Sequence, residues 1–244
     1  MRAQLLCSRM LYDPRTIAFV TEAYFPPMQQ DGLRVQQVHH ELFGSTRAGY
    51  RNFNLVAGGA MLSNPHINGA ANSSVTVLQD RVRIAEELTD TSLDDFLARQ
   101  EIVLRLLAQK LEIPVFVACQ VAIRSLVSSR QYRDAREFLA RGVLRFGDDG
   151  LAPFGRAPHT LGLRFVFPQS ADERNVYQVR IESYTGDVRS VFLENVGMFP
   201  GVVLAGDVEK LGEPVRQTYN FLTERVLEFL ARFDQRTSID GLER

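Results

Sequence analysis

The chain has 244 residues, of which 45% are hydrophobic and 23% are charged, and its formal net charge is −1. This length suits one large domain or two small ones around a shared core, and the apolar content excludes a wholly disordered chain. The near-neutral charge argues against bulk binding to nucleic acid or anionic membranes, and no apolar run approaches the ~18–20 residues of a membrane span.

The composition also bears on the cellular compartment. The N-terminal residues lack the apolar core and the cleavage site of a signal peptide. Two cysteines are too few for a disulfide framework or a metal set, and Cys119 alternates with valines as a buried, reduced thiol would. Lys110 and Lys210 are the only lysines among 28 basic residues, a bias typical of GC-rich genomes. We therefore expect a cytoplasmic bacterial protein.

In the first half of the chain, the patterns predict the order β-α-β-β-β-α. Period-two alternation predicts the strands and helical spacing predicts the helices. Asp31 and Gly44 can cap the first helix, and Ser92 precedes Asp95 in a capping-box arrangement. The predicted elements are a strand (17–25), a helix (31–44), a strand (50–58), two strands that turn at Gln79-Asp80 (75–88) and a helix (93–111).

The second half predicts the same order again. Its first strand, from residue 115 to 124, has the cleanest alternation in the chain. A Thr185-Gly186 turn joins its last two strands. The predicted elements are a strand (115–124), a helix (131–142), strands (161–167, 177–181 and 188–196) and a long helix (214–233).

These orders predict an α+β fold in which two β-α-β-β-β-α halves, residues 1–112 and 113–244, form one integrated domain. Hairpins favour antiparallel pairing, so we expect a mainly antiparallel sheet with the long helices on one face. The repeated order further predicts an internal duplication. Two stretches, 57–74 and 146–160, are rich in Gly, Asn, Ser or Pro and are predicted to be long loops suited to a lid or a partner contact.

Four stretches give the chain a resemblance to a known family. They are GLRFVFP (162–168), YQVRIESY (177–184), TYNFLTERVLEFL (218–230) and VTVLQDRVRIAEEL (75–88). They resemble a sporadically distributed bacterial protein family of unknown function. The resemblance implies a fold type and no activity.

No catalytic motif stands out among the histidines and nucleophiles. His39 and His40 are adjacent and cannot easily ligate one metal together, and the sequence lacks the HExxH, GxSxG and phosphate-loop patterns. His66, in the first loop, and His159, before a strand, are candidate general bases. The acidic cluster at residues 86–95 matches no calcium loop, and we expect no metal and no cofactor.

The arginines are the more informative set. One group crowds the stretch that follows the 115–124 strand, where it either forms a solvated helix face or binds nucleic acid. A second group lies on neighbouring strands, where it forms either a cross-strand ionic ladder with Glu182 and Glu194 or, if unpaired, an anion site. The first group is Arg124, Arg130, Arg133, Arg136, Arg141 and Arg145, and the second is Arg164, Arg180 and Arg189.

Three functional hypotheses follow. The first is a non-enzymatic binding or scaffolding protein that holds a protein partner, or a second copy of itself, through the open sheet face or the long loops. The second is nucleic-acid binding through the arginines, which the net charge does not favour. The third is an enzyme or small-molecule binder with a pocket near His159 or His66 and Arg164. We expect no membrane association.

Overall fold

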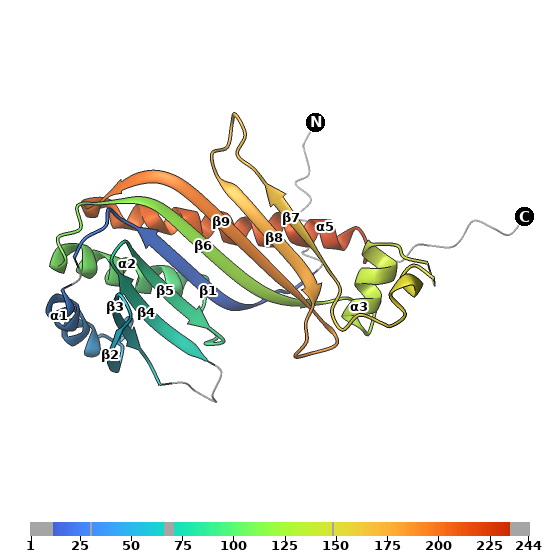
Figure 1. The fold of residues 1–244 in the computed structure, drawn as a ribbon, viewed down its shortest axis with the longest axis horizontal. Coiled ribbons are helices and arrows are strands. Elements are labelled where there is room, and N and C mark those ends of the chain that lie inside the picture. Colours follow the sequence, from blue (N-terminus) through green and yellow to red (C-terminus); the bar gives the residue numbers. More distant parts are fainter. Residues whose placement is uncertain (1–11, 30, 66–70, 148, 235–244) are drawn as a thin grey trace, which may run out of the picture.

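In the computed structural model, which describes residues 12–29, 31–65, 71–147 and 149–234, the chain forms one antiparallel sheet of nine strands (Figure 1). The strand order is β2-β3-β4-β5-β1-β6-β9-β8-β7. The α+β class and the antiparallel sheet predicted from the sequence are therefore confirmed. The strands are β1 (Arg15–Tyr24), β2 (Asn52–Val56), β3 (Gly59–Ser63), β4 (Asn72–Leu78), β5 (Arg81–Glu87), β6 (Val115–Ser128), β7 (Gly162–Phe167), β8 (Val176–Ser183) and β9 (Ser190–Leu204).

The helices predicted over residues 31–44 and 93–111 are observed at those positions, whereas the one predicted over 131–142 begins only at Ala135. Asp31 caps α1 by accepting hydrogen bonds from the Leu33 and Arg34 amides. Ser92 caps α2 by accepting from the Asp95 amide at 3.1 Å, which confirms the predicted cap. The segments are α1 (Gly32–Phe43), α2 (Leu93–Lys110), α3 (Ala135–Glu137), the π-helix η1 (Phe138–Val143), the 3₁₀ helices η2 (Ala152–Phe154) and η3 (Ala205–Leu211), α4 (Gly212–Asn220), the π-helix η4 (Phe221–Val226) and α5 (Leu227–Ala231).

The prediction of a loop over residues 57–74 is wrong. The segment contains β3, and its end forms the start of β4, so the first half has one strand more than the sequence predicted. Gly58 adopts a positive φ of 76° in the tight turn between β2 and β3. At Gly59 a Cβ atom would lie 1.9 Å from the Val77 carbonyl oxygen. The glycines are therefore hairpin residues, and they conceal the strand-like alternation of Ala60 and Leu62.

The two halves meet at the centre of the sheet, where β1 pairs antiparallel with β6. In this register Phe19 lies opposite Ile123, and Thr21 lies opposite Val121. Outward from this pair the strands run β1-β5-β4-β3-β2 on one side and β6-β9-β8-β7 on the other. The predicted boundary near residue 112 thus falls between α2 and β6, and the sheet continues across it.

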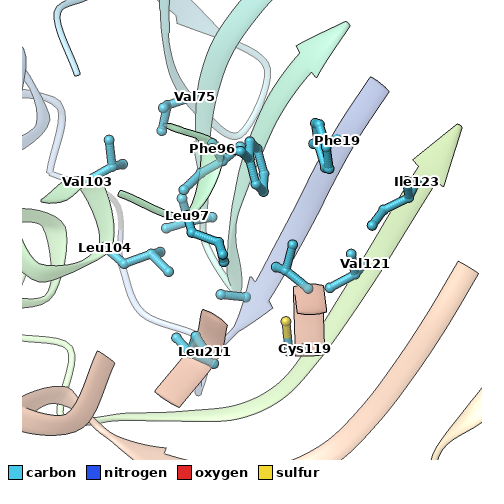
Figure 2. Packing of buried hydrophobic residues seen from close by; sticks show 14 of the residues in the cluster. Phe19, Val75, Phe96, Leu97, Val103, Leu104, Cys119, Val121, Ile123 and Leu211 are labelled. Carbon is cyan, nitrogen blue, oxygen red and sulfur yellow. The ribbon is translucent and has the colours of Figure 1, made fainter. Parts of the chain in front are cut away.

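The core lies between these central strands and the helices packed on them. Phe96 of α2 stacks on Phe19 of β1 with ring centroids 5.2 Å apart, and both are buried beside Ile123 (Figure 2). Cys119 belongs to this cluster, as predicted, and burial raises the pKa of its thiol to about 12. Tyr219 of α4 also stacks on Phe19, at 6.2 Å. Side chains from both halves therefore share one core.

The last helix is predicted over residues 214–233 and is observed as α4, η4 and α5 in succession. It approaches β9 closely because Gly197 has no side chain: a Cβ there would lie 2.5 Å from the Thr218 hydroxyl oxygen. Next to this contact, the side-chain amide of Asn195 donates a hydrogen bond to the Thr218 backbone carbonyl oxygen at 2.9 Å. The π-helical turn that follows places Phe221 against Tyr177 of β8 and Phe167 of β7.

Candidate functional site

One side of the sheet carries charged side chains that alternate along the strands with core residues. We call it the charged sheet face. On β6, for example, Arg124 follows the buried Ile123, and it lies opposite Glu194 of β9. Because side chains on one face of adjacent strands are neighbours, these charges are placed to pair across strands. The face comprises Glu22, Arg81, Arg83, Glu87, Arg124, Arg164, Arg180, Glu182 and Glu194.

Arg124 is the centre of this network. Its guanidinium donates to Glu87 of β5 and to Glu194 of β9, each at 2.7 Å. Burial alone would lower the pKa of Arg124, but the hydrogen bonds and charges of Glu194 and Glu87 raise it above the ordinary arginine value. Arg124 therefore links β6 to β9 and, across β1, to β5, and it is not free to bind an anion.

The arginines nearest the β7 edge are engaged in the same way. Arg180 lies 3.5 Å from Glu194 and 3.9 Å from Glu182, and its guanidinium also lies over the Phe192 ring at 4.9 Å. Arg164 donates to the Gln178 amide oxygen at 2.7 Å. Of the two arrangements left open by the sequence, the structure shows the cross-strand ladder for Arg180. Arg189 is not part of it, and its amide bonds the Asp187 carboxylate in a turn.

The remaining arginines lie away from the charged sheet face, around α3 and η1 at one end of the molecule (Figure 1). Arg136 pairs with Asp134 at 2.8 Å, and Arg141 lies 3.6 Å from Glu137. Arg130 and Arg133 precede α3, and Arg145 follows η1. The structure thus separates the arginines proposed for nucleic acid into Arg124 on the sheet and a second set near α3.

The histidine candidates do not converge with an arginine. His159 is exposed in the connection before β7, and Arg164 is bonded to Gln178. His66 lies outside the described residues. His39 is partly buried between the Phe43 and Phe53 rings, at 5.9 and 5.8 Å, as a boundary histidine would be. Among the described residues no three His, Cys, Asp or Glu side chains gather as a metal site, and none of the described helices is long and apolar enough to cross a membrane.

A different feature of the same region has the properties of a binding site. A groove of about 620 Å³ runs between the β7–β8 pair and the last helix, and we call it the β7 groove. Phe165 of β7 meets Phe229 of α5 edge-on at 5.5 Å, and Phe167 meets Phe221 of η4 at 5.3 Å. The groove is lined by Phe165, Phe167, Glu173, Val179, Ile181, Phe221, Arg225, Val226 and Phe229.

Tyr177 of β8 supports one wall of the groove, because its ring stacks on the lining residue Phe221 with centroids 4.3 Å apart and planes inclined by 17°. Burial raises the pKa of Tyr177, and the nearby charge of Glu173 raises it further. Arg225 and Glu173, the two charged lining residues, have no ion-pair partner among the residues described. The groove is thus an aromatic surface with one free base and one free acid on it.

The backbone of β7 adds a second unsatisfied surface beside the groove. The Ser183 amide donates to the Leu161 carbonyl oxygen at 2.9 Å, and the register continues unbroken along β7. Since antiparallel strands alternate the direction of their backbone groups, residues 163, 165 and 167 face β8. Gly162, Arg164 and Val166 therefore direct their N–H and C=O groups away from the sheet, where β7 has no neighbouring strand in the described part of the chain.

The opposite end of the sheet offers a less suitable cleft. A space of about 650 Å³ lies beside α1 and β2, and its lining includes the exposed Leu33 and Leu55. Half of its lining residues are polar, charged or glycine, and its Arg34 is already paired with Asp31 and Glu112. The β7 groove is the more apolar of the two and carries free charges.

A buried polar cluster between β5 and α2 has acid–base chemistry, but its charged groups are paired with each other. Glu86 is 2% exposed, accepts a 2.7 Å hydrogen bond from the Ser73 hydroxyl and forms an ion pair with Arg99. The Thr91 hydroxyl lies 3.5 Å from the same carboxylate. Because every one of these groups bonds another, the cluster stabilises the packing of α2 on the sheet.

The β7 groove is not evident from the sequence. The sequence patterns predict Phe165 and Phe167 on a strand and Phe229 on the inner side of a helix, and both predictions are confirmed. They do not indicate that β7 is the last strand of the sheet. A comparison with models of known protein families finds no match, and a comparison with curated proteins finds none either.

Proposed function

We propose that this chain is a non-enzymatic binding or scaffolding protein that holds a protein partner at the β7 groove. One observation carries the proposal: an aromatic groove and an unpaired strand edge lie side by side at β7. Aromatic side chains are enriched in the cores of protein interfaces. An added strand would bond the free backbone groups of β7 while its alternate side chains enter the groove, as in known strand-addition complexes.

The composition of the groove favours a protein partner over an enzyme reaction. Pockets for small molecules combine apolar walls with several placed polar groups. Only Glu173 and Arg225 are charged among the lining residues, and no histidine or cysteine lines the groove. The enzyme hypothesis named His159 and Arg164, which are exposed, and Arg164 is bonded to Gln178.

The ion pairs also weaken the nucleic-acid alternative. Binding to a phosphate backbone needs a contiguous surplus of positive charge. On the charged sheet face, Arg124 and Arg180 are paired with Glu87, Glu182 and Glu194, so acids and bases alternate. We therefore do not propose that the charged sheet face binds nucleic acid.

Two further parts of the proposal concern the architecture and the setting. We propose that the halves arose by duplication and that the long helices share one face of the sheet. The corresponding strand orders β1-β5-β4-β3 and β6-β9-β8-β7 support the duplication, with β2 as an addition to the first half. The cytoplasmic bacterial setting is likewise a proposal, and it rests on composition alone.

Site-specific photocrosslinking tests the functional proposal. A benzophenone amino acid replaces Phe167, which is 42% exposed in the groove, and the variant is produced in cells of the source organism. We expect crosslinks to protein from this position. The matched control places the same amino acid at Leu55, which is 73% exposed on the opposite edge strand. Equal crosslinking at both positions, or none at Phe167, would overturn the proposal.

A further inference from the structure

We propose that the partner at the β7 edge is a second copy of the same chain, which pairs β7 with β7 in antiparallel orientation about a two-fold axis at Phe165. The inference rests on the proposed function, since it names the occupant of the same surface. It would join the two nine-stranded sheets into one continuous sheet. The two β7 grooves would then face each other across the axis.

Within the described part of the chain, the β7 edge lacks most of the features that protect a sheet edge from pairing. Natural edge strands are blunted by proline, inward-pointing charge, bulges or a covering segment. The register of β7 with β8 has no bulge, its one charged side chain is Arg164, and Pro168 comes only after its last residue. Val166 and Phe167 remain 55% and 42% exposed. An exposed apolar edge of this kind is a predicted association site.

The residue pattern selects one register among the symmetric ones. With the axis at Phe165, the two Phe165 rings lie opposite each other, Leu163 lies opposite Phe167 of the partner subunit, and Arg164 lies opposite Val166 of the partner subunit. An axis at Arg164 would instead oppose two like charges directly, which is unfavourable. An axis at Val166 would place Arg164 opposite a proline that lacks an N–H donor. An axis at Leu163 would leave Phe167 beyond the paired strands.

The charges of the groove are compatible with self-association. Arg225 and Glu173 have no ion-pair partner within the described part of the chain. A second copy brings one free base and one free acid to the same interface, so that neither sign is buried without its opposite. A partner that is uniformly acidic or basic would leave one of the two opposed by a like charge.

Native mass spectrometry of the full chain, together with light scattering at about 10–100 μM, tests the dimer. The diagnostic variant is Val166→Pro. The Val166 amide faces away from β8, so the substitution removes a donor that the single chain does not use, at an edge position that tolerates proline. The dimer loses one such hydrogen bond on each strand, and we expect its dissociation constant to rise at least about tenfold.

The matched control is Leu55→Pro on β2. Val56 closes the turn with Gly59, so the backbone groups of Leu55 face away from β3, as those of Val166 face away from β8. The control is expected to leave the dimer intact. A wild-type chain that is monomeric over the whole concentration range, or a Val166→Pro chain that dimerises as the wild type does, would overturn the inference.

Cysteine crosslinking tests the register and does not depend on the proline variant. In a Cys7→Ser background, Phe165→Cys places two cysteines opposite each other at the separation of a close antiparallel pair, which a disulfide spans. We expect this variant to form a disulfide dimer under mild oxidation. Leu163→Cys and Phe167→Cys alone should not, whereas an equal mixture of the two should. Crosslinking of Leu163→Cys alone, with none at Phe165→Cys, would exclude this register.

The two proposals fail in distinguishable ways. If the chain is monomeric while the benzophenone at position 167 captures a different protein, the second-copy inference is wrong and the proposed function stands. If the chain dimerises but Val166→Pro has no effect, the dimer lies elsewhere and the inference is wrong. If position 167 captures neither the chain itself nor another protein, both are wrong.

Discussion

We expect the substitution Arg99→Met to destabilise the fold by about 3–5 kcal/mol, because it leaves the Glu86 carboxylate buried without its counter-charge. The Glu86 side chain is 1% exposed and that of Arg99 is 22% exposed. After the substitution the Ser73 hydroxyl, at 2.7 Å, is the main remaining donor to the carboxylate. One neutral hydrogen bond does not replace the ionic partner of a desolvated carboxylate.

The assay is urea unfolding followed by circular dichroism, with thermal melts in parallel. For a chain of this size, 1 kcal/mol corresponds to roughly 2–4 °C in Tm, so the expected shift is about 6–20 °C. The double variant Glu86→Met with Arg99→Met removes both charges and should recover much of the loss, because a buried ion pair contributes little compared with an apolar replacement.

The control for this prediction is Arg105→Met on the same helix. Arg105 is 51% exposed and bonds Glu101 one turn away at 2.9 Å, so its removal should change stability by less than about 0.5 kcal/mol. Two results would contradict this reasoning. One is that Arg99→Met lowers the free energy of unfolding no more than Arg105→Met does, and the other is that the double variant is less stable than Arg99→Met alone. Either would mean that Glu86 does not depend on Arg99 as a buried ion-pair partner.

Three further predictions concern the core and the contacts of Asp234. The raised pKa of Cys119 means that the folded chain keeps a proton that the unfolded chain releases, so stability should fall between about pH 9 and pH 12, by up to about 4 kcal/mol; Cys119→Ala should flatten alkaline urea titrations above pH 9, and an unchanged slope would refute the reasoning. Asp234→Ala removes the acceptor of the Tyr12 hydroxyl and of the backbone amides of Arg130 and Gln131 after β6, and should cost at least about 2 kcal/mol by urea unfolding; a neutral result would mean that this buried carboxylate does not hold these segments together. Gly197→Ala forces a Cβ against Thr218 and should cost about 1–3 kcal/mol, and Thr218→Ala should relieve part of it; equal loss with and without the second change would place the strain elsewhere.

Several parts of the fold were readable from local patterns. The alternation of buried Val121 and Ile123 with more exposed residues predicted β6, and the Ser92–Asp95 cap predicted the start of α2. These signals are local, because the side chains that set them lie within a few residues of one another. The antiparallel pairing of the sheet was predicted because the sequence indicates hairpins, which join antiparallel strands. β3 was missed because its glycines serve a tight turn and a close approach to Val77, which the sequence alone does not distinguish from a loop.

The site was harder to predict because it depends on strand order. No local pattern indicates that β7 lies at the margin of the sheet, beyond β8, while the later strand β9 pairs with β6 at the centre. Phe165 and Phe229 are separated by more than sixty residues and become neighbours only in the assembled sheet. The pairing of Arg124 with Glu87 likewise joins the two halves and could not be read from either one. The order of the strands in the sheet, which depends on contacts between residues far apart in the sequence, decides which arginines are unpaired and which aromatic side chains are exposed.

Amide hydrogen exchange of β7 in the full chain tests the central claim most directly. In an isolated copy the Arg164 and Val166 amides have no strand to bond and should exchange as fast as the outward amides of Phe53 and Leu55 on β2. If β7 is the binding edge and a second copy occupies it, the two β7 amides should exchange at least about 100-fold more slowly than the β2 pair at 100 μM protein, and dilution should abolish the difference. Equally fast exchange on both edges at every concentration would contradict the second-copy account.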